Sequence, residues 1–226
     1  RCPDASIVGA VPNSLGPGVL IEQYGSVEQK HHYLPRLAKG LEVPCFARTG
    51  PTSGSDAATM RDIGYVTKGK FEGKETLGIR VSWDKRYITL SPKATLLGLA
   101  FRLFDPEGLL GDEEDIGITL AMIPTDHDGV NIGRRHLPSG SAFPNGPNWG
   151  KDVFIPMEWV IGGQERVGQG WRMLMNCLSV GRAISLPASA TSGAKNMLRL
   201  TTAYARVRKQ CGMPIGNMEG IEEGLS

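Results

Sequence analysis

The chain has 226 residues, of which 40% are hydrophobic and 21% are charged, and its 25 basic and 23 acidic residues leave a formal net charge of +2. These values are ordinary for a globular protein and exclude a disordered or fibrous chain. The charges are interspersed without a basic block, so we expect no nucleic-acid partner. The longest mostly apolar run, residues 94–104, is broken by Arg102 and is too short to cross a bilayer.

The ends and the cysteines predict a piece of a longer, cytoplasmic protein. The sequence opens at Arg1 without an initiator Met or a signal-peptide pattern, and it stops at Ser226 directly after an acidic, helix-compatible segment. The four cysteines form no C-x-x-C pair, and the four histidines form no ligand pattern. We therefore expect reduced thiols and no metal site.

The first elements in chain order are helices. Residues 6–18 are small and rich in Gly and Pro, and helical spacing is expected from Val19 to Ala38. Gly25 separates two short helices, and Ser26 is the expected N-cap of the second.

From Val43 onward the pattern is typical of short strands separated by Gly, Asp and Pro turns. This pattern predicts antiparallel strands in a β-barrel or sandwich. The expected strands are Val43–Ala47, Gly78–Trp83, Tyr87–Leu90, Thr95–Phe104, Ile116–Ile123 and Val153–Pro156.

Beyond Trp159 the spacing is helical again. Pro187 is expected to kink or interrupt the first of two helical segments, and Gly212 with Pro214 to end the second. The order of helices, strands and helices predicts an α+β fold and argues against a Rossmann or P-loop architecture. The expected domains are 1–42 (end of an N-terminal helical domain), 43–157 (a β-domain) and 158–226 (start of a helical bundle).

The segment from Cys45 to Asp56 is the candidate ligand loop. It places four hydroxyls among glycines, at Thr49, Thr52, Ser53 and Ser55. Such a loop can direct hydroxyls and backbone N–H groups at a phosphate or a flavin ring edge, although a plain surface turn has the same composition. A serine hydrolase is disfavoured because no G-x-S-x-G elbow is present.

Five ordered segments resemble the acyl-CoA dehydrogenase family, and together they span almost the whole chain. They are Tyr24 to Pro35, similar to YG-T-x-EQK-x-x-YLP; Ala47 to Asp56, similar to A-x-T-E-P-x-A-G-S-D; Lys85 to Thr89, similar to K-x-W-I-T; Gly168 to Arg182; and Tyr204 to Ile215, similar to YA-x-x-R-x-x-FG-x-x-I. Residues 83–90, 133–136 and 218–223 resemble the long bacterial fatty acyl-CoA dehydrogenases. The resemblance implies an acyl-CoA dehydrogenase-like fold with a helical N-terminal segment, a middle antiparallel β-barrel or sandwich domain and the start of a C-terminal helical bundle.

The resemblance also implies a flavin site and a substrate site. FAD would contact Phe46, Thr49, Ser55, Tyr87, Ile88, Thr89 and Arg208, and the acyl-CoA would contact Ser55 and Arg182. Arg208 would reach the FAD phosphates of a neighbouring subunit. The departures from the family pattern are Arg48, Tyr87 in place of Trp, Cys211 in place of Phe and Glu219 in place of a common Gln.

The implied reaction is the FAD-dependent oxidation of a fatty acyl-CoA to the trans-2-enoyl-CoA, with an electron-transfer flavoprotein or a similar acceptor as partner and a homo-oligomeric assembly. The catalytic glutamate is expected beyond Ser226, because the alternative family position is occupied here by Gly181. The sequence alone leaves open a non-catalytic acyl-CoA- or flavin-binding or assembly module. We expect a bacterial cytoplasmic protein; membrane association of the full-length protein is left open.

Overall fold

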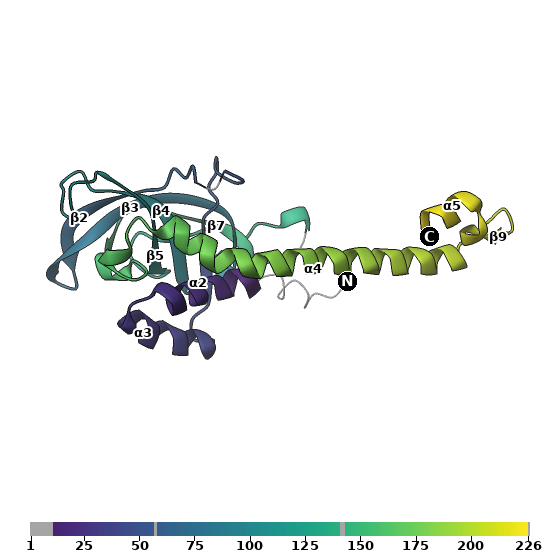
Figure 1. Cartoon of the computed structure of the whole chain (residues 1–226), viewed down its shortest axis with the longest axis horizontal. Helices are drawn as coiled ribbons and strands as arrows, with labels where there is room; N and C mark the ends of the chain where they lie inside the picture. The colour runs from purple at the N-terminus through teal and green to yellow at the C-terminus, as the bar shows by residue number, and fades with distance from the viewer. Residues whose placement is uncertain (1–10, 57, 141–142, 226) are drawn as a thin grey trace. The chain divides into compact units, whose positions relative to one another are not determined.

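The computed structural model describes residues 11–56, 58–140 and 143–225, with only the backbone described for residues 11–15 and 180–182. The chain divides into two compact units, residues 1–179 and residues 180–226. The first unit contains two helices, a sheet and the beginning of a long third helix (Figure 1). The domain boundaries expected from the sequence stay predictions.

The two N-terminal helices are α2 (Val11–Tyr24) and α3 (Val27–Ala38). Helix α2 begins eight residues earlier than the expected Val19, and Pro17 lies inside it. Its small residues allow close packing, since a Cβ on Gly16 would lie 2.8 Å from the Leu178 side chain. Ser26 caps α3 as expected, in a reciprocal capping box with Gln29.

Seven strands form one sheet in the order β1-β4-β2-β3-β7-β6, with β5 paired to β4. The strands are β1 (Pro44–Ala47), β2 (Ile63–Phe71), β3 (Lys74–Thr89), β4 (Leu96–Phe104), β5 (Asp115–Pro124), β6 (Asn131–Ile132) and β7 (Asn145–Pro156). Short 3-10 turns are η1 (Ser91–Lys93), η2 (Pro138–Gly140), η3 (Met157–Trp159) and η4 (Gln164–Arg166). The helices and the sheet confirm the expected fold class.

The sheet differs from the expected strands in several respects, including the unexpected β6 and the start of β7 at Asn145 instead of Val153. It is mixed, because β4 pairs in parallel with both β1 and β2. The segments Gly78–Trp83 and Tyr87–Leu90 belong to one strand, β3, whose ladder with β7 shifts register twice. Strand β2 had escaped sequence analysis because its polar residues, Thr67, Lys68 and Lys70, hide the apolar alternation.

Apolar side chains fill both faces of the sheet. One cluster is formed by side chains of the sheet strands, among them Val81, Trp83 and Phe101. The other joins the outer face of β4 and β5 to the helices through Leu20, Met173 and other buried side chains. The sheet is therefore buried on both faces along β4, which explains its nearly continuous apolar sequence.

The long helix α4 (Gly170–Val207) runs through both units as one helix of 38 residues. Pro187 was expected to kink or interrupt the helix; the interruption was wrong, because a proline removes one backbone hydrogen bond and the surrounding turns can continue the helix, while the kink stays a prediction. After it, the second unit contains the hairpin β8 (Lys209–Gln210) and β9 (Met213–Pro214), the turn η5 (Ile215–Asn217) and helix α5 (Glu219–Leu225). Within the described ranges, none of the helices has the length and hydropathy needed to cross a membrane.

Candidate functional site

The loop formed by residues 48–56 leaves β1 and is tied at once to β3. The backbone N–H of Arg86 donates to the carbonyl of Thr49 at 3.0 Å, and the N–H of Gly50 donates to the carbonyl of Ser53 at 3.1 Å. Ser53 is buried, whereas Thr49 is half-buried and Ser55 is exposed. The turn signal at Gly50 thus closes the loop on itself and leaves part of its hydroxyl groups accessible.

A buried ion pair lies beneath this loop. The Lys85 ammonium lies 2.5 Å from Oδ2 of Asp62 and donates to the carbonyl of Arg48 at 2.9 Å. The other carboxylate oxygen of Asp62 accepts the backbone N–H of Asp84 at 3.0 Å. Lys85 is 0% and Asp62 is 5% exposed. Burial lowers the pKa of the Lys85 ammonium, and the charge of Asp62 acts in the opposite direction.

The end of β3 supplies the second part of the candidate site. Tyr87 has a positive φ of 57°, and its carbonyl accepts a hydrogen bond from Nδ2 of Asn145 at 3.0 Å. The Tyr87 ring is 63% exposed, and its centroid lies 4.9 Å from that of His136. Ile88 is buried and Thr89 half-buried. The left-handed backbone of Tyr87 interrupts the alternation of buried and exposed side chains along β3. As a result, Arg86 and Tyr87 are both exposed, and the next buried side chain is that of Ile88.

The structure brings the predicted residues of the first unit together through these ties. The bond between Thr49 and Arg86 joins the start of the 48–56 loop to the segment that carries Tyr87, Ile88 and Thr89. Phe46 lies in β1, shortly before Thr49 in the sequence. It is half-buried, on the face of the strand opposite to Cys45. Phe46 packs against the cluster that contains Leu20 and Met173, whereas Ile88 is buried in the cluster that contains Val81 and Trp83, so the two apolar side chains do not share one surface.

Two predicted arginines lie in the second unit. Arg182 is part of helix α4, where the structure describes its backbone but not its side chain. Arg208 follows α4 in the second unit, where it is exposed and exchanges backbone hydrogen bonds with Tyr204 and Ile215. Their expected contacts with substrate and FAD therefore stay predictions.

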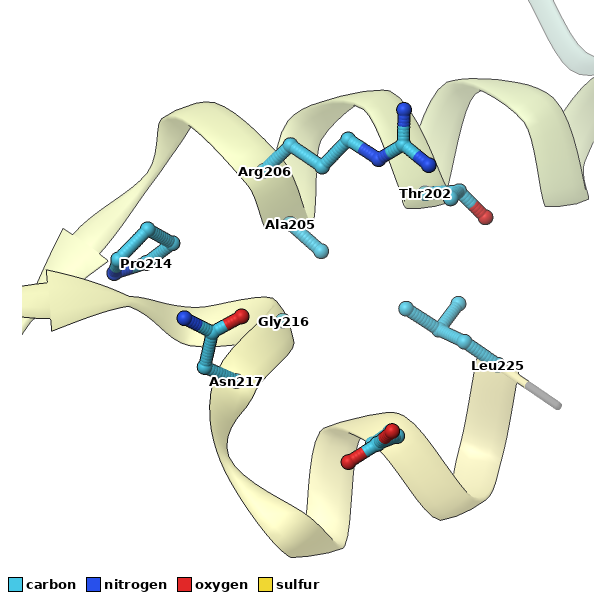
Figure 2. A pocket seen from close by; sticks show the side chains of 8 residues that line it. Thr202, Ala205, Arg206, Pro214, Gly216, Asn217 and Leu225 are labelled. Carbon is cyan, nitrogen blue, oxygen red and sulfur yellow. The ribbon is translucent and has the colours of Figure 1, made fainter.

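The structure has a cavity beside the 48–56 loop and another in the second unit. A cavity of about 380 Å³ borders the loop, between Gly50–Ser53 and the segment Ser82–Asp84, and its lining includes neither Thr49 nor Thr89. In the second unit, a cavity of about 330 Å³ lies between α4 and the turn leading to α5. Figure 2 shows Arg206 and Thr202 of α4 on one side and Asn217 and Leu225 on the other.

Sequence reasoning missed Asp62, Asn145 and the burial of Lys85. A signal for Lys85 was present, because Val81, Trp83 and Lys85 alternate in one phase of β3 and all three are buried. Asp62 and Asn145 carried no such signal. Both act across the sheet on residues 23 and 58 positions away.

Sequence relatives of the chain include proteins named as acyl-CoA dehydrogenases. No protein-family model matches the chain. It is 55% identical over 104 residues to a Proteus mirabilis protein named Protein HemX, across 46% of this chain and 61% of that protein. It is 30% identical over 215 residues to the probable acyl-CoA dehydrogenase FadE10 of Mycobacterium tuberculosis, across 94% of this chain and 30% of the relative. The chain thus spans only part of the length of these relatives.

Solved structures share the fold over nearly the whole chain. Butyryl-CoA dehydrogenase from Megasphaera elsdenii superimposes with a TM-score of 0.77 at 23% identity, over 98% of this chain and 54% of that one. Acyl-CoA dehydrogenase complexed with FAD from Bacillus anthracis gives a TM-score of 0.71 at 26% identity, over 89% of this chain and 32% of that one. The relatives and the fold agree with the ordered motifs, and the chain belongs to the acyl-CoA dehydrogenase family.

Proposed function

We propose that this chain supplies the flavin-binding β-domain of an enzyme that oxidises fatty acyl-CoA thioesters to trans-2-enoyl-CoA. The observation that carries the proposal is the hydrogen bond between Arg86 and Thr49, which joins the 48–56 loop to the Tyr87–Thr89 segment. These are the two segments whose sequences match the family's flavin contacts. The Bacillus anthracis neighbour, which was solved with FAD, supports the choice of cofactor.

The residues present fit an isoalloxazine ring by their chemistry. The ring is flat and uncharged with a polar edge, so it needs an apolar surface next to neutral donors and acceptors. The exposed Tyr87 and the half-buried Phe46 offer aromatic surface, and the hydroxyls of Thr49 and Thr89 offer neutral hydrogen-bonding groups. No carboxylate is required to face the ring in this assignment.

The roles of the chain's residues follow from this fit. Bound FAD would accept the electrons that leave the acyl chain. Thr49 and Thr89 would orient the ring and Tyr87 would cover it, while the buried Ile88 would anchor the segment of β3 that carries Tyr87 and Thr89. Ser55, which is exposed, would bind both FAD and the acyl-CoA, and Arg182 would bind the substrate. Arg208 would bind FAD phosphates, for which a guanidinium is well suited.

Removal of the substrate α-proton requires a carboxylate that we do not assign to this chain. At the family position before Arg182 stands Gly181, which has no proton-accepting group. We therefore propose that the 226 residues bind cofactor and substrate without completing turnover. Steady oxidation of a long acyl-CoA by the purified chain with an artificial electron acceptor would refute this part of the proposal.

We also propose an electron-transfer flavoprotein or a similar carrier as acceptor, a homo-oligomeric assembly and a cytoplasmic location. The acceptor follows from the reaction, because reduced flavin must be reoxidised before a second turnover. The assembly follows from the assignment of Arg208 to a cofactor in a neighbouring subunit. Size-exclusion chromatography with light scattering would test the assembly.

The decisive experiment is the flavin spectrum of protein purified without added FAD, followed by FAD titration of the apoprotein. We expect a visible flavin absorbance, and we expect Thr89→Ala and Ser55→Ala to weaken FAD binding by about tenfold each, as for the loss of one good hydrogen bond. Thr67→Ala on β2 is the matched control, because its hydroxyl donates only to the neighbouring Lys68 carbonyl. Equal FAD affinity in all variants would contradict the assignment.

A further inference from the structure

Lys85 occupies a position that an apolar residue would normally fill. It lies in the inward phase of β3, between the buried Trp83 and Ile88, and its side chain is 0% exposed. Removing an ammonium group from water is unfavourable, and packing alone does not require it. The charged atom must therefore serve an interaction that a hydrocarbon side chain cannot make.

That interaction is with the 48–56 loop. The Lys85 ammonium donates to the carbonyl of Arg48, 37 residues earlier in the chain, directly before the Thr49 carbonyl that accepts from Arg86. Two consecutive carbonyls of the loop are thus held by two consecutive residues of β3. A lysine ammonium has three donors, so it can hold a carbonyl and a carboxylate at once.

Asp62 completes the arrangement and fixes the ammonium in place. One of its oxygens pairs with Lys85 and the other accepts the N–H of Asp84, so its carboxylate is oriented from two directions. The carbonyl of Asp62 also accepts the N–H of Arg102 in β4. The pair is therefore anchored in the sheet, and its remaining partner, the carbonyl of Arg48, belongs to the loop. Because the Lys85 side chain is fully buried, it cannot contact a bound substrate.

We propose that the Asp62–Lys85 pair is a positioning device that sets the backbone of the 48–56 loop, and that FAD binding depends on it. The inference rests on the proposed function for its cofactor, but the effect on the loop itself does not. The specific claim is that the bond from Lys85 to the Arg48 carbonyl determines where the Thr49 hydroxyl and N–H lie. Lys85 acts through the loop and is not a catalytic residue.

The test uses the double variant Asp62→Asn/Lys85→Met in the purified protein. Asparagine keeps an acceptor for the Asp84 N–H, and methionine keeps the volume, so neither charge is left buried alone. We expect the melting temperature of the FAD-free variant to lie within a few degrees of wild type. We expect hydrogen exchange of the loop amides 49–56 to be at least tenfold faster and the FAD dissociation constant to rise at least tenfold.

The control is Arg80→Met/Asp152→Asn, which removes an exposed ion pair that also involves β3 but joins it to β7. It should leave both loop exchange and FAD affinity unchanged, because the Arg80 guanidinium donates to the carbonyl and carboxylate of Asp152 and not to the 48–56 loop.

Three results would overturn the inference. Unchanged loop exchange in the double variant would show that the pair does not hold the loop. Faster exchange with unchanged FAD affinity would show that loop position does not govern binding. An equal effect in the Arg80/Asp152 control would assign the change to charge removal in general. A wild-type protein that binds no FAD would instead overturn the proposed function and the cofactor half of the inference, and the exchange comparison would still decide the loop half.

Discussion

The two compact units bury their apolar side chains to very different extents. In residues 1–179, Leu99 and Phe101 of β4 are 0% exposed, and the loop that carries Thr49 is tied to the same sheet. In residues 180–226, Leu198 and Leu200 of α4 are 53% and 63% exposed. Burial of apolar area is the main favourable contribution to folding, so the free energy of unfolding must come mostly from the first unit.

This difference separates two kinds of functional residue. Thr49, Ile88 and Thr89 lie on a backbone that the sheet of their own unit holds in place. Arg208 lies on a hairpin whose strands, Lys209–Gln210 and Met213–Pro214, bury little apolar surface. Precise positioning needs a rigid support, so the first group can be fixed by this chain more firmly than the second.

The largest expected contrast is in cysteine reactivity. Cys45 is completely buried, and burial raises the pKa of its thiol to about 12, whereas Cys211 is exposed. At pH 8 a thiol with such a pKa is ionised roughly 1000 times less than an ordinary one, and only the thiolate reacts. We expect iodoacetamide to label Cys211 at least 1000 times faster than Cys45, as measured by peptide mass spectrometry.

Denaturant provides the control for this comparison, because both thiols should react at similar rates in the unfolded chain. Cys177 is half-buried, and burial raises its pKa, so its rate should lie between the other two. Comparable labelling of Cys45 and Cys211 in the folded protein would contradict the contrast between the units.

The next contrast is in the free energy of unfolding. Phe101 packs so closely that a Cβ on Gly64 would lie 2.7 Å from its ring. Phe101→Ala should therefore lower the free energy of unfolding by about 3–5 kcal/mol, as for a large buried side chain. Leu200→Ala should change it by less than about 0.5 kcal/mol, because the side chain is already exposed. Urea unfolding of both variants measures the difference, and similar losses would show that α4 is as well packed as β4.

A smaller effect is expected at the end of β3. Asn145 is 6% exposed, and its Nδ2 donates to the carbonyl of Tyr87, the residue with positive φ. Asn145→Ala should lower the free energy of unfolding by about 1–3 kcal/mol, since the carbonyl loses its donor. Asn145→Asp should lower it further, because a carboxylate cannot donate and would be buried.

The control for Asn145 is Asn131, an exposed asparagine on the neighbouring β6 whose Nδ2 donates to the carbonyl of Gly129. Asn131→Asp should change the free energy of unfolding by less than about 0.5 kcal/mol. Equal melting temperatures for Asn131→Asp and Asn145→Asp would show that the hydrogen bond from Asn145 to the carbonyl of Tyr87 does not stabilise the protein.

Local patterns in the sequence were enough to predict much of this fold. The Ser26 capping box, the apolar runs of β1, β4 and β5 and the helical spacing after Trp159 each reflect interactions within a few residues. The mixed sheet was not predictable in this way, because the parallel pairing of Cys45 with Leu97 joins residues 52 positions apart. Continuity of α4 through Pro187 also depends on more than local propensity.

The candidate site divides along the same line. Thr49, Ser55 and Thr89 were predicted because they lie inside short motifs that resemble those of a family. Asp62 and Asn145 were not, because each acts through one hydrogen bond to a distant strand or loop, and an isolated Asp or Asn has no sequence signature. Lys85 was predicted as part of a motif, but its buried pairing depends on which face of β3 turns inward.

The smallest expected effect concerns the connection between α3 and β1. Glu42 accepts hydrogen bonds from Arg36, at 2.7 Å, and from the hydroxyl of Thr95. Burial by itself raises the pKa of Glu42, but the bonds from Thr95 and Arg36 outweigh it, and the pKa lies below its ordinary value of 4.5. A lowered pKa in the folded state means that the unfolded chain binds the proton more tightly, so stability falls as the carboxylate is protonated.

The contribution of Glu42 should accordingly be complete above about pH 5 and decline as the pH falls through the ordinary value and then the lowered one. We expect Glu42→Gln to lower the free energy of unfolding by less than about 1 kcal/mol at pH 7, because Arg36 is partly exposed to water. The difference from wild type should shrink in acid, as urea unfolding at a series of pH values would measure. As a control, Glu113→Gln in an exposed loop should change the free energy of unfolding by less than about 0.5 kcal/mol at pH 7. A difference in the free energy of unfolding between wild type and Glu42→Gln that grew toward low pH would contradict this prediction. It would mean that the contacts of Glu42 with Arg36 and Thr95 do not stabilise the connection between α3 and β1.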